Sequence, residues 1–449
     1  MDARLRWPLV VLVCLGVWLH AADALVATTV MPSAIAEIGG LPYLYWTIAL
    51  YELGSIVTGA ASGLLTQRLG LRTAMSAAAG VYMVGCATSA LASHMSVMLV
   101  GRLVQGFGGG AMLALSYVGV SQLFPPDLWP RVLAIVAGVW GVSSLVGPLV
   151  GGAFASAGVW RGAFWAFAAQ AALLVAAAPW LAAARTPPSE EAAELPGRQL
   201  VALTAGVLAI AAAGVQHQTW VMAACSLAGI GALALTLRLE RNATARLFPP
   251  SPLSLAVPWG PGYVAVLLLT MATVSFTVYG PLLLARLFGV SPLLAGLLVA
   301  TESVAWTLAA IATANAPAHR ESLLIRGGTA AIAVAVAGLA WTMPRGPVWA
   351  LGLWTAVQGA GFGICWAFLL RRIVAGVPDG DSDRASAAVP TTQMIGYAIG
   401  AAVCGMVANA LGLHDGAAPD IVRGVAFWVF AAFFPLAGLG ALSAWRIAR

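Results

Sequence analysis

The segment Gln105-Gly106-Phe107-Gly108-Gly109-Gly110 lies inside an apolar run, and it decides the fold because it is repeated. The segment Gln358-Gly359-Ala360-Gly361-Phe362-Gly363 matches it 253 residues later, again inside an apolar run. The same offset aligns three further pairs: Arg131 with Arg384, Gly147 with Gly400, and Gly152 with Gly405. Chance matching in a chain rich in alanine and glycine is the alternative, but glycines and loop arginines agree at one offset. The repeat predicts two similar halves in the same orientation.

The composition is that of a chain surrounded by hydrocarbon. Of the 449 residues, 61% are hydrophobic and 8% are charged, whereas a soluble domain carries about 25% charged residues. A helix needs about 20 mostly apolar residues to cross a bilayer. The sequence contains fourteen such runs, near 9–34, 44–65, 73–93, 96–122, 131–156, 161–184, 199–215, 218–237, 261–285, 291–314, 323–343, 347–371, 384–411 and 421–446. Because the runs are long and lack polar alternation, we predict an all-α polytopic membrane protein with fourteen transmembrane helices rather than a barrel.

The repeat divides these runs into three parts. The first six and the last six runs correspond to each other, whereas the pair near 199–215 and 218–237 has no counterpart. We therefore predict a six-helix bundle over residues 1–184, cytoplasmic linkers plus two extra transmembrane helices over 185–258, and a second six-helix bundle over 259–449. Transporters built from parallel repeats bind substrate near the midplane between their halves.

The arginines predict the orientation. All 22 basic residues are arginine, and with a cytoplasmic N-terminus only four would face outward: Arg161, Arg286, Arg345 and Arg423. Because positive charge concentrates on the cytoplasmic side, we predict a multi-pass protein of the cell (cytoplasmic) inner membrane with both termini cytoplasmic. The arginines are spread over short loops and form no patch, so we expect anionic membrane lipids, and no nucleic acid, as their partners.

Neither metal nor enzymatic chemistry is indicated by the sequence. The cysteines are scattered singly through apolar runs without disulfide or metal-binding spacing, and we interpret all five as small buried hydrophobic residues. The glycine-rich stretches lack the strand and the Gly-Lys-Ser/Thr sequence of a phosphate loop. No nucleophile and base occur in a catalytic pattern. We therefore expect no enzyme, no metal and no cofactor.

The stretch GLLTQRLGLR (residues 63–72) follows the second apolar run. It is similar to the cytoplasmic loop motif of the major facilitator superfamily, in which glycines allow close approach of helices and arginines form a charge-based gate. This resemblance assigns the cytoplasmic gate to Gly63, Arg68, Gly70 and Arg72. The sequence differs from the motif at two positions, where Gln67 replaces an acidic residue and Leu71 an arginine, so the complete charge relay is missing.

Three more segments carry the same resemblance. DALVATTVMP (residues 23–32) keeps the spacing from an acidic residue to a proline, and RLVQGFGGG (residues 102–110) resembles the motif with an intramembrane arginine. GVSSLVGPLVGG (residues 141–152) resembles the antiporter motif, with Gly147, Pro148, Gly151 and Gly152 as its characteristic residues. Ordinary packing of small residues is the alternative. Over nearly its whole length the chain resembles the fourteen-helix drug:proton antiporter branch of this superfamily, which implies the major facilitator fold and multidrug efflux.

Four ionisable residues other than histidine lie well inside apolar runs: Asp23, Glu52, Arg102 and Glu302. A charge at the bilayer centre costs about 2.5–3.5 kcal/mol, so a function is the expected reason for keeping it. Hydrocarbon favours the neutral form of an acid, and a neighbouring arginine favours the carboxylate. We therefore expect Asp23 to be the main proton carrier and Arg102 to tune it.

The other ionisable candidates have two interpretations each. Glu52 and Glu302 occupy matching places, ten residues after a proline in each half. Each is a candidate for a second proton site or for recognition of cationic substrate, the alternatives being a place near the outer headgroups or a permanent contact between helices. His20, on the same helix face as Asp23, is a candidate proton relay or a histidine satisfied by a neighbour.

Five polar residues are candidates to line the substrate cavity: Gln105, Trp140, Gln358, Gln393 and Tyr397. Few polar groups among apolar walls suit a lipophilic ligand, and packing between helices is the alternative role. We predict a monomeric transporter that exports lipophilic small molecules by alternating access, with the proton gradient as its energy source. Export of a lipid or secreted metabolite by the same fold is the alternative. A non-transporting membrane scaffold or a channel is the alternative of another class.

Overall fold

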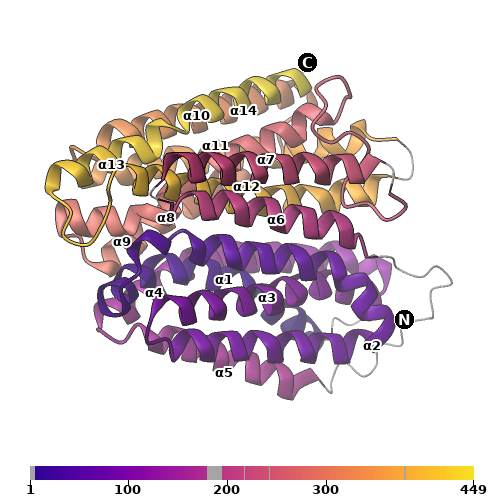
Figure 1. The fold of residues 1–449 in the computed structure, drawn as a ribbon. Coiled ribbons are helices and arrows are strands. Elements are labelled where there is room, and N and C mark those ends of the chain that lie inside the picture. Colours follow the sequence, from indigo (N-terminus) through magenta and orange to yellow (C-terminus); the bar gives the residue numbers. More distant parts are fainter. Residues whose placement is uncertain (1–5, 179–194, 217, 242, 379–380, 449) are drawn as a thin grey trace. The chain divides into compact units, whose positions relative to one another are not determined.

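The computed structural model describes residues 6–178, 195–216, 218–241, 243–378 and 381–448. The predicted boundary between residues 184 and 185 lies outside these ranges. So do Arg4, Arg185 and Arg449, three of the arginines that the orientation prediction places on the cytoplasmic side. The described residues are mostly helical, and the longest described connection, residues 243–259, leads from α7 to α8 (Figure 1). They divide into two compact units, the first made of Met1–Gly40 and Leu50–Leu195 and the second of Leu41–Ala49 and Pro196–Arg449.

The first unit contains α1 to α5, where α1 packs against α3, α4 and α5. Their bounds are Trp7–Ile38 for α1, Trp46–Ala90 for α2, Met95–Leu123 for α3, Trp129–Ser156 for α4 and Arg161–Ala177 for α5. The predicted loop over residues 63–72 is helical on both sides of a single break at Gly70. Gly70 has φ 73° and ψ 157°, a region that only glycine adopts readily. The two predicted runs are therefore two helices that share the label α2 and meet at this break, and both lie against α3, since a Cβ atom on Gly106 would overlap Tyr51 and one on Gly108 would overlap Tyr82.

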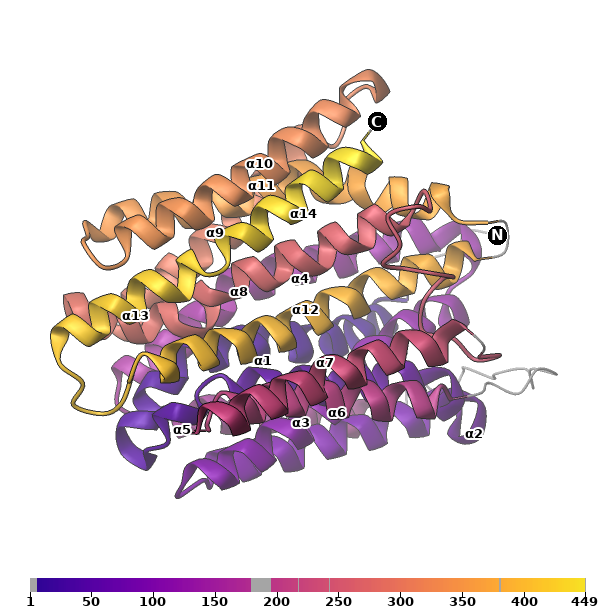
Figure 2. The same cartoon turned by 45° about the horizontal axis from the view of Figure 1, so that its top comes forward.

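The second unit contains α6 to α14 (Figure 2). The bounds are Gly197–Ala213 for α6, Thr219–Arg241 for α7, Gly260–Phe288 for α8, Pro292–Thr313 for α9, Glu321–Thr342 for α10, Val348–Gly376 for α11, Ser382–Ala410 for α12, Pro419–Ala431 for α13 and Phe434–Ile447 for α14. The pair without a counterpart, α6 and α7, packs together, and α6 also contacts α12. The inserted pair is thus part of the second unit.

The short segment Leu41–Ala49 is fastened to this second unit by side chains. The hydroxyl of Tyr45 donates to the carbonyl of Ala211 at the end of α6, at 2.6 Å. Asn409 of α12 donates from Nδ2 to the carbonyls of Pro42 and Gly214, at 2.9 Å each. The first turn of α2 therefore belongs to the second unit and the rest of α2 to the first.

Most described helices have the length and composition of membrane spans. Eleven helical segments among the described residues qualify, with α2 counted once, whereas α5 and α6 are shorter, at 17 residues each. The run near 421–446 is divided into α13 and α14 just before Pro435, because proline cannot donate the helical hydrogen bond. The all-helical prediction is confirmed, and the count of fourteen spans stays a prediction.

The repeated glycine segment joins α3 to α2 in the first unit. A Cβ atom on Gly106 would overlap the backbone of Tyr51, and one on Gly110 would overlap the backbone of Ser55. Only hydrogen fits at these two positions. The two helices are therefore in backbone contact along this seam, at two points that lie one helical turn apart.

The same seam joins α11 to α9 in the second unit. A Cβ atom on Gly359 would overlap the backbone of Glu302, and one on Gly363 would overlap that of Trp306. By these contacts Glu302 corresponds to Tyr51. The sequence had matched Glu302 with Glu52, and this pairing is wrong by one residue, because the spacing from a proline does not fix the packing register of the following helix.

Candidate functional site

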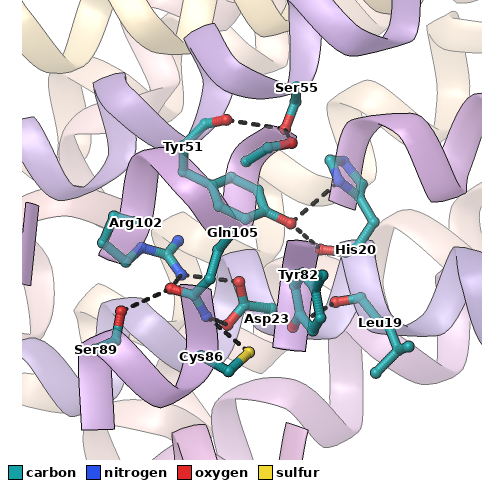
Figure 3. Close-up of polar contacts among 11 residues, drawn as sticks. Leu19, His20, Asp23, Tyr51, Ser55, Tyr82, Cys86, Ser89, Arg102 and Gln105 are labelled. Carbon is teal, nitrogen blue, oxygen red and sulfur yellow. Dashed lines mark hydrogen bonds and ion pairs between the residues drawn. The ribbon is translucent and has the colours of Figure 1, made fainter. Parts of the chain in front are cut away.

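A buried ion pair joins α1 and α3 of the first unit (Figure 3). Arg102 donates from Nη1 to Oδ2 of Asp23 at 2.8 Å, and the two side chains are only 1% and 0% exposed. Gln105 donates from Nε2 to Oδ1 of Asp23 at 3.4 Å and accepts from Arg102 at Oε1, at 3.2 Å. The predicted proton carrier is thus held by Arg102 and Gln105, the two polar side chains of the segment 102–110.

Helix geometry explains why these groups meet. Arg102 and Gln105 are three residues apart on α3, so they share one face, and α3 packs against α1, which carries Asp23. Two residues in the second half of α2 also contact the side-chain amide of Gln105. Ser89 donates to Oε1 of Gln105 at 3.0 Å, and Nε2 of Gln105 contacts the sulfur of Cys86 at 3.2 Å. Gln105, predicted to line the cavity, is fully engaged within the unit.

The electrostatics of the pair limit what it can do. Removing one partner of a buried ion pair leaves an uncompensated charge and costs about 3–5 kcal/mol. Protonation of Asp23 has the same consequence, since a neutral acid no longer balances the guanidinium of Arg102. Asp23 can therefore take up a proton only together with a change in the surroundings of Arg102.

Tyr51 of α2 is a site residue that the sequence analysis missed. Its ring lies under the guanidinium of Arg102, with 4.3 Å between Cζ and the ring centroid. Its hydroxyl lies 3.1 Å from Nδ1 of His20 and donates to the carbonyl of His20 at 3.1 Å. His20 also meets the ring of Trp140 edge-on, with centroids 6.0 Å apart. His20 is therefore connected to Arg102 through Tyr51.

The two predicted glutamates differ in their hydrogen bonds. Glu52 is 7% exposed, and its Oε2 has no hydrogen-bond partner among the described residues. In the second unit, Gln358 donates from Nε2 to Oε1 of Glu302 at 2.9 Å. Gln393 and Tyr397 lie half-buried on α12. That Gln358, Gln393 and Tyr397 line a substrate cavity stays a prediction.

The predicted antiporter motif lies on α4, against the helix that carries Asp23. A Cβ atom on Gly147 would be 3.1 Å from the carbonyl oxygen of Ala22, and one on Gly151 2.7 Å from that of Val26. The other two motif residues, Pro148 and Gly152, are buried on the same helix. The motif thus brings α4 close to α1 on both sides of Asp23.

The predicted gate motif lies on α2. Gly63, Arg68 and Arg72 are exposed on α2, and their role in a gate stays a prediction.

Among the described residues, no three His, Cys, Asp or Glu side chains gather as a metal site would require. Of the five cysteines, Cys86, Cys365 and Cys404 are buried, and the other two are half-buried.

Known proteins of similar sequence are transporters. Residues 13–401 match the profile of the Major Facilitator Superfamily. The chain is 30% identical to a probable multidrug-efflux transporter of Mycobacterium tuberculosis, over 96% of this chain and 92% of the relative. It is 26% identical to an uncharacterized MFS-type transporter of the same organism, over 87% of this chain and 58% of that protein.

Solved structures of low sequence identity share the fold. A D-xylose-proton symporter superposes with a TM-score of 0.69 at 18% identity, covering 98% of this chain and 97% of the symporter. A peptide transporter superposes with a TM-score of 0.71 at 14% identity, covering 100% and 97%. With the profile match and a relative of nearly equal length, these likenesses identify the chain as a multi-pass membrane transporter, not an enzyme, that belongs to the Major Facilitator Superfamily.

Proposed function

We propose that this protein exports lipophilic small molecules across the cell membrane in exchange for protons, by alternating access and with both termini in the cytoplasm. The similarity to a probable multidrug-efflux transporter supports efflux as the direction. The small number of polar residues among the candidates for the cavity lining supports lipophilic cargo, because recognition of a hydrophilic compound needs more polar groups. We propose a monomer that contacts anionic lipids through its loop arginines.

The observation that carries proton exchange is the contact between Arg102 and Asp23 at 2.8 Å, out of reach of solvent. In this proposal, Asp23 binds a proton when a rearrangement of α1 and α3 withdraws Arg102, and releases the proton when the pair forms again. Uptake and rearrangement are coupled because each state of Asp23 favours a different place for the guanidinium. His20 and the two buried glutamates are the further candidates for proton transfer.

The energy available fits this coupling. One charge that crosses a potential of 100 mV releases about 2.3 kcal/mol. At about 1.4 kcal/mol per factor of ten, one proton per cycle sustains roughly a fifty-fold gradient of a neutral compound.

Everted membrane vesicles with an acidified interior test the proposal. Addition of a transported compound releases protons from vesicles that contain the wild-type protein. Asp23→Asn abolishes this release, because the amide cannot carry a proton, whereas Asp23→Glu retains part of it. Asp420→Asn is the matched control, since the Asp420 side chain is 96% exposed. The amount of each variant in the membrane is measured alongside, and wild-type exchange by Asp23→Asn removes this residue from the mechanism.

Export of a secreted metabolite is the second candidate. A fungal relative, the Acurin A biosynthesis cluster MFS-type transporter of Aspergillus aculeatus, is 30% identical over 159 residues, which is 35% of this chain and 29% of that protein. Genes for a biosynthetic cluster or a lipoprotein beside the gene of this protein favour metabolite or lipid export, and a drug-responsive regulator favours drug efflux. The same vesicle assay with a panel of compounds decides between the two.

A further inference from the structure

The first helices of the two predicted bundles, α1 and α8, each carry a charged residue five positions after a proline. In α1 these residues are Pro32 and Glu37, and in α8 they are Pro281 and Arg286. A proline inside a helix removes one backbone hydrogen bond and weakens the helix at that point. We call the helical residues after each proline the tip of that helix. The two tips thus match in position and carry opposite charges.

The tip of α1 is fastened to other parts of the first unit. Glu37 accepts a hydrogen bond at Oε1 from Nη1 of Arg161, at 2.6 Å, and one at Oε2 from Nε1 of Trp160, at 2.7 Å. Arg161 also donates from Nη2 to the carbonyl of Ala92, at 2.9 Å, in the connection between α2 and α3. Its guanidinium lies over the ring of Trp160, with 4.2 Å from Cζ to the centroid. One arginine therefore joins the tip of α1, the start of α5 and the connection before α3.

The tip of α8 is fastened to the second unit in the same way, with the charges exchanged. Arg286 donates from Nη2 to Oδ1 of Asp415 at 2.7 Å, and from Nη1 to the carbonyl of His414 at 3.0 Å. Both partners lie in the connection between α12 and α13. In each unit, the partner of the tip thus lies at or just before the start of the last predicted span of its bundle.

The charges of these pairs are in unfavourable places without their partners. Glu37 lies in the last turn of α1, where the helix dipole disfavours a negative charge. Arg161 and Arg286 are two of the four arginines that the orientation prediction places on the outer side, where basic residues are less frequent. Exposed ion pairs contribute little to folding stability. Stability alone therefore does not explain two such pairs at matched positions.

We propose that the two ion pairs are latches, each of which holds the tip of the first helix against its own unit and releases it to bend at the proline. With the latch closed, the tip moves with its unit as one body. With the latch open, the tip moves alone. The partially exposed carboxylates, 54% for Glu37 and 63% for Asp415, allow opening at small cost, because water replaces the lost contacts. This inference goes beyond the proposed function and depends neither on the cargo nor on proton exchange.

The mobility of nitroxide spin labels on the tips tests the latches. Ala36 and Ala285 are exposed, and each precedes the charged residue of its tip. A cysteine at either position carries the label in the purified full-length protein in detergent, with no compound and no proton gradient present. The two half-buried native cysteines, Cys14 and Cys225, are replaced by serine, so that the label attaches at the chosen tip.

Each latch should respond to its own charge alone. Glu37→Gln raises the ratio of mobile to immobile label at Ala36 by up to about fivefold, the range of an exposed ion pair, and leaves the label at Ala285 unchanged. Asp415→Asn does the reverse. Asp420→Asn is the control, because this acid is 96% exposed and pairs within α13, and it changes neither label.

Reversal of one pair separates latching from general damage. Arg286→Glu with Asp415→Arg gives the second unit the polarity that the first unit has, with the acid on the tip and the arginine on its partner. The double variant should therefore return the label at Ala285 to its immobile form, although each single variant frees it. A tip that stays immobile when its acid is neutralised overturns the latch of that unit. Equal mobilisation of both tips by one variant, or a reversed pair as mobile as the single variants, overturns the proposal as a whole.

Discussion

Tyr51 and Glu302 occupy the same place in the two units, since each has its backbone pressed against a glycine of the repeated segment, Gly106 for Tyr51 and Gly359 for Glu302. The packing is shared, but the chemistry is not. Tyr51 places its ring under Arg102, whereas Glu302 accepts a hydrogen bond from an amide. One helix seam thus supports a network with its own cation in the first unit and, in the second, an acid that forms no ion pair with a described residue.

Alanine at either seam glycine should destabilise the protein. Gly106→Ala and Gly359→Ala each place a methyl group where the neighbouring backbone already lies. Overpacking of this kind costs about 1–3 kcal/mol, so both variants should melt at lower temperature in detergent. Gly327→Ala in α10 is the control, because a Cβ atom there meets nothing within 4 Å. Equal melting temperatures for all three variants would show that the seam can relax.

Tyr51 has two contacts that substitutions can separate. Tyr51→Phe keeps the ring under Arg102 but loses the hydroxyl contact to His20, a hydrogen bond that contributes about 1 kcal/mol. Tyr51→Leu also loses the cation–π contact, which contributes about 0.5–2 kcal/mol. Compound-dependent proton release should therefore fall moderately in the first variant and further in the second. Tyr43→Phe, at an exposed tyrosine, should behave as the wild type, and equal rates for all three would exclude Tyr51 from the coupling.

The sequence predicted the helices and the central ion pair for clear physical reasons. Long apolar runs leave no choice but helix in a bilayer, and an acid and an arginine inside such runs each need a partner. Asp23 and Arg102 were therefore identifiable before any contact was known. The pairing of Gln358 with Glu302 was not identifiable, because both residues were assigned separate roles from their polarity alone.

Contacts that depend on packing register were beyond the sequence. Tyr51 is one aromatic residue among many apolar ones, and nothing in the run indicates that its ring faces Arg102. The matching of Glu302 with Glu52 failed for the same reason, since spacing along a chain does not give the rotation of a helix. The break at Gly70 was predicted as a longer loop, because a single residue with positive φ leaves little trace in composition.

Substitution of Gly70 should weaken the junction within α2. At φ 73° and ψ 157°, any side chain is strained, and such strain costs about 1–3 kcal/mol. Gly70→Ala should melt at lower temperature than the wild type. Gly80→Ala lies in the same helix with nothing within 4 Å of its Cβ position, so it should be neutral or stabilising by about 0.5–1 kcal/mol. If both variants melt together, the two halves of α2 do not depend on this backbone conformation.

The ion pair predicts a dependence of stability on pH that differs between its two partners. Asp23→Asn leaves the guanidinium of Arg102 buried without a counter-charge, and arginine stays charged at every accessible pH. Its destabilisation, about 3–5 kcal/mol for a broken buried pair, should therefore persist from neutral to acidic solution. Arg102→Gln leaves the carboxyl group of Asp23, which can take up a proton.

The destabilisation of Arg102→Gln should accordingly shrink as the pH falls, because the neutral acid needs no counter-charge. The double variant leaves no buried charge behind. Its loss of stability should therefore be smaller than the sum of the losses in the two single variants. Melting temperatures of the wild type and the three variants, measured in detergent across a series of pH values, check both points. Strict additivity would mean that the pair is not energetically coupled. Equal pH profiles for Asp23→Asn and Arg102→Gln would mean that Asp23 does not take up a proton when its arginine is gone. That result would exclude Asp23 as the proton carrier.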